Sequence, residues 1–252
     1  MGVDESAALE PIAVTLAGGG PDVLLVHGGA SSTTTWAGME PLGSRWTLKV
    51  VHRRGYPPSP PPPRGRQDFE VDAADLAPLL DGRPHVIAHS YGALGALIAA
   101  TQRPEQVRSL TLIEPALFLD PKDPEVARFK EMGDAVLRHG LGTDPAILRE
   151  FLQIAGAQVG DGPLSAEVVR GVLRAQGSRS PGQADPALDV LRDAGLPTLV
   201  VSGDHTPAVE RMCDAACEAL DATRVVVPGA SHFVASAPGF ADLLEQFLVS
   251  AG

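Results

Sequence analysis

Ser90 stands where an apolar run, His85–His89, passes directly into a segment with helical periodicity, Tyr91–Gln102. A serine at a sharp strand-to-helix turn can hold its hydroxyl clear of a sheet, provided that the residues two before and two after it are small. Here they are Ala88 and Gly92. The usual nucleophile pattern has glycine at both places, so we treat Ala88 as a tolerated departure. A serine before a helix can also be only an N-cap, so the interpretation depends on its partners.

His232 is the base that we expect for this serine. A serine hydroxyl needs a neighbouring base near neutral pH, and histidine suits that role. His232 follows the apolar run Arg224–Val227, in a short loop before the last helical segment, Phe240–Val249. The other six histidines adjoin strands, lie in a helical interval or precede Thr-Pro, and are weaker candidates: His27, His52, His85, His89, His139 and His205.

Backbone donors for a negatively charged oxygen are expected at Gly29 and Tyr91. The apolar run Val23–His27 ends in a glycine-rich loop, and Tyr91 follows the serine. Free N–H groups at these two residues could bind the oxyanion of a reacting carbonyl group. A simple turn is the alternative explanation for the glycines.

Two carboxylates could orient the histidine. Glu114 closes the apolar run Ser109–Ile113, whereas Asp204 follows the run Thr198–Ser202. We favour Glu114, because a glutamate at the end of a buried strand needs a partner. Glu114 could instead form a salt bridge to an arginine such as Arg108 or contact a substrate, and Asp204 could instead cap a turn.

These residues lie at the ends of short apolar runs that alternate with helical segments. Such alternation predicts parallel strands joined by crossover helices, hence an α/β fold with a mostly parallel central sheet flanked by helices. The expected strands are Ile12–Leu16, Val23–His27, Thr47–His52, His85–His89, Ser109–Ile113, Thr198–Ser202 and Arg224–Val227. The expected helices of the core are Val71–Leu80, Tyr91–Gln102, Pro207–Leu220 and Phe240–Val249.

One interval, 116–186, shows no strand pattern. Asp123 and Asp144 each precede a proline, as an N-cap precedes proline at the first helical position, and Ser165 can cap a third helix through Ala175. We therefore predict an all-helical cap that acts as a lid, with packing decoration as the alternative. The predicted α/β core consists of two segments, 1–115 and 187–252. The predicted cap, 116–186, is inserted between them.

Large apolar side chains could line a pocket beneath this cap. The candidates are Trp36, Phe118, Phe129 and Met132, and core packing is the alternative for each. A medium-sized, largely apolar small molecule is the ligand that they favour.

Composition limits the partners. The net charge of -11 and the presence of only three lysines argue against nucleic-acid binding, which needs a basic face.

No apolar run approaches the roughly 20 residues of a membrane span, and the first ten residues do not resemble a signal peptide, so we expect a cytoplasmic protein without a membrane partner. No phosphate-binding glycine loop or zinc-ligand spacing is present, so neither a cofactor nor a metal is expected. The lack of asparagine and the richness in Ala, Arg, Gly and Pro suggest a GC-rich bacterium; the oligomeric state is not readable.

The order of these pieces resembles the α/β-hydrolase superfamily over nearly the whole chain. The matching parts are His27–Gly29, Arg53–Tyr56, the turn at Ser90, the helical insert and the Gly229-x-x-His232 loop. The resemblance implies Ser90 as nucleophile, His232 as base, and the N–H groups of Gly29 and Tyr91 as the oxyanion hole.

The acid departs from the usual family pattern. The family most often places it three residues after a glycine that follows the strand before the last crossover helix, and Thr206 occupies that place here. Some members, including haloalkane dehalogenases and certain lactone hydrolases, carry the acid after the strand that ends here at Glu114. The resemblance is therefore compatible with our preference for Glu114 over Asp204.

The resemblance implies a cofactor-free serine hydrolase that cleaves an ester, lactone or thioester through an acyl-enzyme. A serine nucleophile argues against dehalogenase or epoxide-hydrolase chemistry, for which related proteins use aspartate. The same fold also hosts carbon–carbon bond hydrolases, lyases and acyltransferases, and a non-catalytic ligand-binding homologue is a third alternative.

Overall fold

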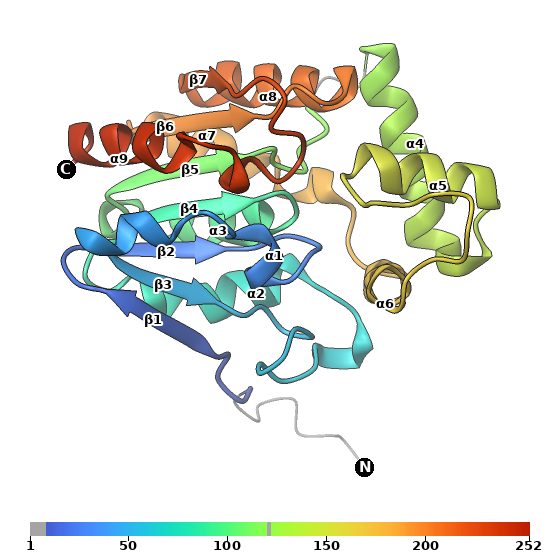
Figure 1. Cartoon of the computed structure of the whole chain (residues 1–252), viewed down its shortest axis with the longest axis horizontal. Helices are drawn as coiled ribbons and strands as arrows, with labels where there is room; N and C mark the ends of the chain where they lie inside the picture. Colours follow the sequence, from blue (N-terminus) through green and yellow to red (C-terminus); the bar gives the residue numbers. More distant parts are fainter. Residues whose placement is uncertain (1–8, 120–121) are drawn as a thin grey trace.

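A computed structural model describes residues 9–119 and 122–252, and its centre is a seven-stranded sheet. The strand order is β1-β3-β2-β4-β5-β6-β7, and every neighbouring pair is parallel except β1 with β3 (Figure 1). The strands span Val14–Gly18, Asp22–Val26, Thr47–Val51, His85–His89, Ser109–Ile113, Thr198–Ser202 and Thr223–Val226, in order from β1 to β7. This confirms the predicted fold class, with strand ends within two residues of those expected.

Helices cover both faces of the sheet, which explains why its central strands are buried along their whole length. Every residue of β4, β5 and β6 is buried. On one face, α2 (Phe69–Leu76), α3 (Gly92–Gln102), α7 (Pro186–Asp193) and α8 (Pro207–Leu220) share one apolar core. On the other face, α9 (Phe240–Ser250) packs with the segment that follows the short α1 (Ser32–Thr35).

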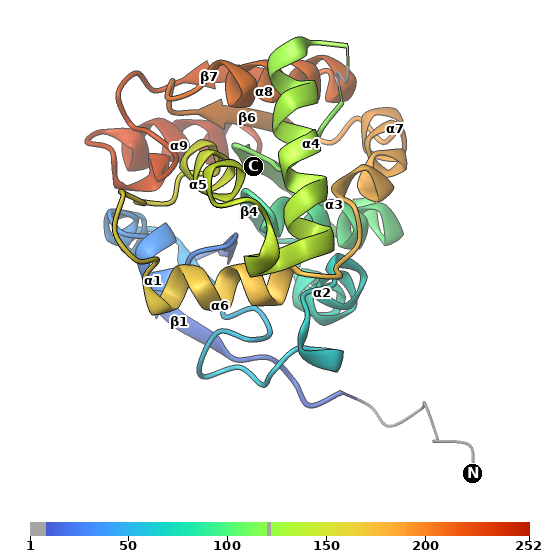
Figure 2. The ribbon, with the colours of Figure 1, turned by 90° about the vertical axis from the view of Figure 1, so that its right-hand side faces the viewer.

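Three helices lie over the carboxyl ends of the parallel strands: α4 (Pro124–His139), α5 (Pro145–Ile154) and α6 (Ala166–Ala175), as Figures 1 and 2 show. Each begins as the sequence predicts. The side chains of Asp123, Asp144 and Ser165 accept hydrogen bonds from backbone N–H groups of the first turn of α4, α5 and α6. The division at 116–186 stays a prediction, but α7, which we did not expect, packs with α3 and α8 of the core.

Within the described residues, no helix is long and apolar enough to cross a bilayer. Residues 1–8, on which the expectation about a signal peptide rests, lie outside the described part of the chain.

A buried ion pair holds the loop after β2. The guanidinium of Arg53 donates from Nε and Nη2 to Asp72 Oδ2, at 3.1 and 2.7 Å, and from Nη1 to the carbonyl oxygen of Gly28 at 2.8 Å. Both side chains are almost fully buried. Because a buried charge without its partner is costly, Asp72 on α2 fixes Arg53, and Arg53 fixes the loop at Gly28.

We expect Asp72→Ala to lower the free energy of unfolding by about 3–5 kcal/mol, since it leaves the Arg53 charge buried without a counter-ion. The matched control is Asp81→Ala, which removes the exposed ion pair of Asp81 with Arg103 and should cost less than about 1 kcal/mol. Urea unfolding followed by circular dichroism measures both. Equal losses in the two variants would contradict this account.

Candidate active site

Ser90 lies at a strained turn between β4 and α3. Its backbone φ is 52°, in the left-handed region that non-glycine residues rarely adopt, and its N–H donates to the carbonyl oxygen of Ile113 at 2.9 Å. A Cβ on Gly92 would come within 2.3 Å of the carbonyl oxygen of His27, so only glycine fits there. Ala88 is fully buried in the core, which accommodates its methyl group. The local structure therefore holds Ser90 in the conformation that a nucleophile at such a turn requires.

Glu114 lies directly beyond β5 and contacts His232. Its Oε2 is 2.6 Å from Nδ1 of His232, and its Oε1 accepts a hydrogen bond from the N–H of Gly203 at 2.8 Å. The third neighbour is His205, whose Nδ1 is 3.2 Å from Oε1. Three segments that are far apart in the sequence therefore meet at one carboxylate.

The protonation of Glu114 follows from these contacts. Burial by itself would raise the pKa of the carboxyl group, but hydrogen bonds from His205 and His232 outweigh burial and hold the pKa at about 2. Glu114 is therefore a carboxylate throughout the neutral range. An ionised carboxylate at Nδ1 keeps the other ring nitrogen of His232 free to take up a proton.

Asp204, the alternative acid, lies elsewhere. Its side chain is exposed, and its backbone N–H donates to Oε1 of Glu210. Thr206 is the N-cap of α8 and accepts a hydrogen bond from the N–H of Val209 at 3.4 Å. Of the two carboxylates that the sequence offers, only Glu114 contacts the histidine.

Two side chains hold the loop after β2 by hydrogen bonds to its carbonyl oxygens. Arg53 binds the carbonyl oxygen of Gly28, and the hydroxyl of Tyr56 donates to the carbonyl oxygen of Gly29 at 2.7 Å. In a trans peptide the C=O and N–H groups point in opposite directions, so Arg53 fixes the direction of the Gly29 N–H. Within residues 9–119 and 122–252, the N–H groups of Gly29 and Tyr91 donate to no other group of the protein. Both are available to a ligand.

A cavity of about 410 Å³ opens between the sheet and the cap. Its core side includes the expected residues Gly29, Ser90, Tyr91, Glu114 and His232. Its cap side and the adjoining helix α8 are largely apolar and include Phe118, Phe129, Leu137, Phe151, Val172 and Met212. The site is thus concave, mostly apolar and furnished with a few polar groups at one end, as small-molecule sites are.

The comparisons with known proteins identify the family of this chain. The model of the alpha/beta hydrolase family matches residues 23–242. The chain belongs to this family. It is 31% identical over 235 residues to the 2-(acetamidomethylene)succinate hydrolase of Mesorhizobium japonicum, covering 86% of this chain and 83% of that protein. It is 30% identical over 192 residues to the pimeloyl-[acyl-carrier protein] methyl ester esterase of Methylococcus capsulatus, covering 73% of this chain and 72% of that protein.

Solved structures support the fold. A thermophilic esterase from Thermogutta terrifontis superposes with a TM-score of 0.67 at 23% identity, over 95% of this chain and 93% of that one. At this identity the likeness concerns the fold alone. The two sequence relatives above are both named for hydrolytic reactions, so family and relatives together support a hydrolase.

Two expected pocket residues of this hydrolase lie outside the cavity wall. Trp36 is buried on the α9 side of the sheet, among core side chains such as Leu25 and Ile87. Met132 is buried between α4 and α8, in the cluster that includes Ala208. Our assignment of these two residues to the pocket is wrong, because the side chain of each packs into a core cluster. The other two candidates, Phe118 and Phe129, do line the cavity.

His89 and His205 are residues whose roles the sequence analysis missed. His89 donates from Nε2 to the carbonyl oxygen of His232 at 2.9 Å, and their ring centroids are 4.4 Å apart. Burial lowers the pKa of His89 to about 3, so its ring is neutral and holds the His232 loop through one N–H. Its place directly before Ser90 was the available signal, but packing explained it equally well.

Among the described residues, Glu114, His205 and His232 are also the one group of three or more possible metal ligands whose ligand atoms all lie within 4.8 Å of one another. The two Nδ1 atoms and both carboxylate oxygens are engaged in the hydrogen bonds given above. Hydrogen bonds therefore account for the short distances among these three side chains.

Two tyrosines of the site offer a matched test of how the loop after β2 is held. Tyr56→Phe removes the hydrogen bond to Gly29, and we expect it to lower the free energy of unfolding by about 1 kcal/mol. The hydroxyl of Tyr91 is buried and has no partner among the described residues, so Tyr91→Phe should leave stability unchanged or raise it slightly. Urea unfolding of both variants provides the measurement; a larger loss in Tyr91→Phe would contradict the assignment.

Proposed function

We propose that this protein is a serine hydrolase that cleaves a carboxylic ester, lactone or thioester through an acyl-enzyme, without a cofactor. The observation that carries the proposal is the 2.6 Å contact between Glu114 Oε2 and His232 Nδ1 at the cavity that Ser90 also lines. Nucleophile, base and orienting carboxylate therefore occupy one site, as acyl transfer requires.

In the proposed mechanism, Ser90 Oγ attacks the carbonyl carbon while His232 Nε2 takes its proton. The N–H groups of Gly29 and Tyr91 stabilise the oxyanion of the tetrahedral intermediate. His232 then returns the proton to the leaving alcohol or thiol, and the acyl group remains on Ser90. A water molecule, deprotonated by His232, attacks the acyl-enzyme, and the same sequence of proton transfers releases the acid.

The cavity wall favours an apolar substrate. Its two cationic side chains among the described residues are already paired, Lys130 with Asp134 at 2.7 Å and Arg179 with Asp68 at 2.9 Å. A succinate-type dicarboxylate, as in the name of one relative, would need cations that are free to bind it. A medium-sized apolar acyl or alkyl group fits the phenylalanine-rich wall better, which is closer to the methyl ester in the name of the other relative.

The direct test is labelling with a fluorophosphonate probe, followed by peptide mapping. We expect the wild-type protein to be labelled at Ser90 and Ser90→Ala to remain unlabelled. Hydrolysis of p-nitrophenyl esters of increasing acyl length, and of a lactone and a thioester panel, then identifies the substrate class. Absence of labelling at Ser90 in folded protein would overturn the proposal.

The two carboxylates can be separated by amide substitutions of equal size. Glu114→Gln should lower kcat by about 10³-fold or more, because the amide no longer stabilises the protonated ring of His232. Asp204→Asn should change kcat by less than about twofold, as expected of an exposed position. Ester hydrolysis under saturating substrate measures both. Near-normal turnover in Glu114→Gln together with a severe loss in Asp204→Asn would transfer the role of acid to Asp204.

A further inference from the structure

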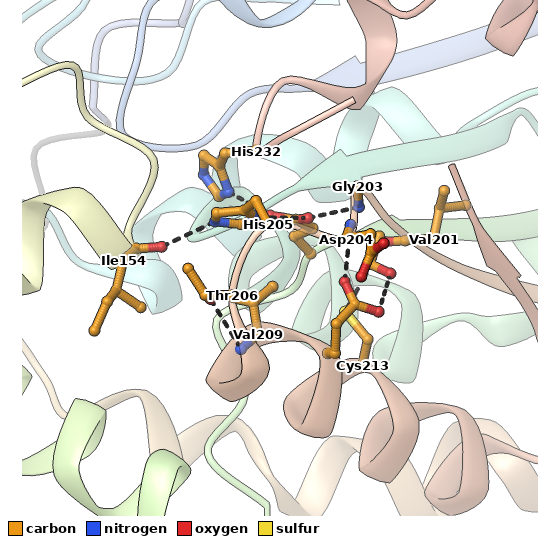
Figure 3. Close-up of polar contacts among 12 residues, drawn as sticks. Ile154, Val201, Gly203, Asp204, His205, Thr206, Val209, Cys213 and His232 are labelled. Atoms are coloured by element: carbon orange, nitrogen blue, oxygen red, sulfur yellow. Dashed lines mark hydrogen bonds and ion pairs between the residues drawn. The ribbon is translucent and has the colours of Figure 1, made fainter. Parts of the chain in front are cut away.

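His205 lies between the catalytic carboxylate and the cap. It follows β6, and Nδ1 of its ring lies 3.2 Å from Oε1 of Glu114. Its Nε2 lies 3.1 Å from the carbonyl oxygen of Ile154, as Figure 3 shows. Ile154 is the last residue of α5 in the cap. Only 12% of the side chain is exposed. One ring therefore joins the acid of the proposed triad to the helical layer above it.

Both partners of this ring are hydrogen-bond acceptors. A backbone carbonyl cannot donate, and neither can the carboxylate of Glu114, which already accepts hydrogen bonds from Gly203 and from His232. A neutral imidazole carries one N–H and could satisfy only one of the two contacts. Both contacts are hydrogen bonds only when the ring carries a proton on each nitrogen.

We propose that His205 is a positively charged positioning residue that fastens the cap to Glu114 and keeps the acid ionised. This inference rests on the proposed function, because it assigns Glu114 to the catalytic group. His205 touches no reacting atom; it acts through the carboxylate and through the cap.

The charged and titratable groups around His205 agree with a cationic ring. Glu114 faces it from the end of β5, and Glu210 faces it from α8. The ring centroid of His232 is 5.7 Å from that of His205, and His89 contacts His232. Burial alone would lower the pKa of His205, but the hydrogen bond and charge of Glu114, with smaller contributions from Ile154 and Glu210, raise it. Because the folded-state pKa is raised, the stabilisation is present at low pH and is lost as pH rises through that pKa.

The same contact places the cap against the base. Gly156, two residues after Ile154, has a φ of 82°, and a Cβ on it would lie 2.3 Å from Cβ and Cγ of His232. The cap backbone at Gly156 therefore lies directly on the imidazole of His232. Anchoring Ile154 through His205 holds this backbone in place, so that the position of the cap and the orientation of the base depend on one side chain.

A positive charge at this distance also affects the reaction. It opposes protonation of His232, so its removal should move the acidic limb of the kcat/KM profile to higher pH, by about one pH unit for a partly screened charge. A side chain that serves packing alone would leave this limb unchanged.

Two amide variants separate the two contacts. In His205→Asn the amide occupies the place of Nδ1, so it can donate to Glu114 but cannot reach Ile154. In His205→Gln the amide reaches the place of Nε2, so it can donate to Ile154 but not to Glu114. We expect His205→Asn to raise KM about fivefold, the equivalent of one hydrogen bond to the cap, and His205→Gln to lower kcat about fivefold. Both should show the shifted acidic limb, whereas the exposed His139→Asn should match wild type.

Nitrogen NMR of the wild-type protein tests the charge without any substrate. We expect both ring nitrogens of His205 to give signals of the protonated type at pH 7. A neutral ring at pH 7, or an unshifted acidic limb in both variants, would overturn the proposal, and the NMR result decides if neither variant folds. If the fluorophosphonate fails to label Ser90 while His205 is doubly protonated, the proposed function fails and the charge and contacts assigned to His205 stand.

Discussion

The buried charge of Glu114 is the constraint on which the rest of the site depends. Its side chain is fully inaccessible to solvent, and removing an ionised carboxylate from water costs several kcal/mol unless its oxygens are satisfied. The protein satisfies them with donors from two loops, His232 after β7 and Gly203 with His205 after β6. These donors can surround the carboxylate only when the ends of β5, β6 and β7 lie next to one another.

The sheet brings these ends together by its register. Ile113 pairs with His89 on one side and with Val201 on the other, so that the turn at Ser90 and the loop at Gly203 flank the end of β5. Backbone hydrogen bonds continue beyond the strands, from Ser90 to Ile113 and from Glu114 to Val201. Ser90 and Glu114, the proposed nucleophile and acid, thus share one edge of the sheet, and little conformational freedom remains to be lost when a substrate binds.

Sequence patterns were sufficient for the parts that depend on local chemistry. Three fully buried strands, β4, β5 and β6, were predicted to the residue, and Asp123, Asp144 and Ser165 cap the helices as expected. The short helix α7 was missed because proline and polar residues precede it. The contacts of His205 could not be foreseen, since they join residues 51 and 91 positions apart. Trp36 failed as a pocket residue for the same reason: which way a large apolar side chain points is decided by tertiary packing.

The departure at Thr206 follows from the same constraint. Thr206 caps α8 through its hydroxyl and so fixes the start of the helix, and the ring of the preceding residue, His205, contacts Glu114 and Ile154. With Glu114 as the proposed acid at the end of β5, a second carboxylate in this loop would put like charges together near a buried site, which is unfavourable. The cationic ring that we propose for His205 has the opposite effect, because it balances the charge of Glu114 and also donates one N–H to Ile154. The N-cap of α8 at Thr206 and the link from His205 to α5 are therefore both compatible with one buried charge at the end of β5.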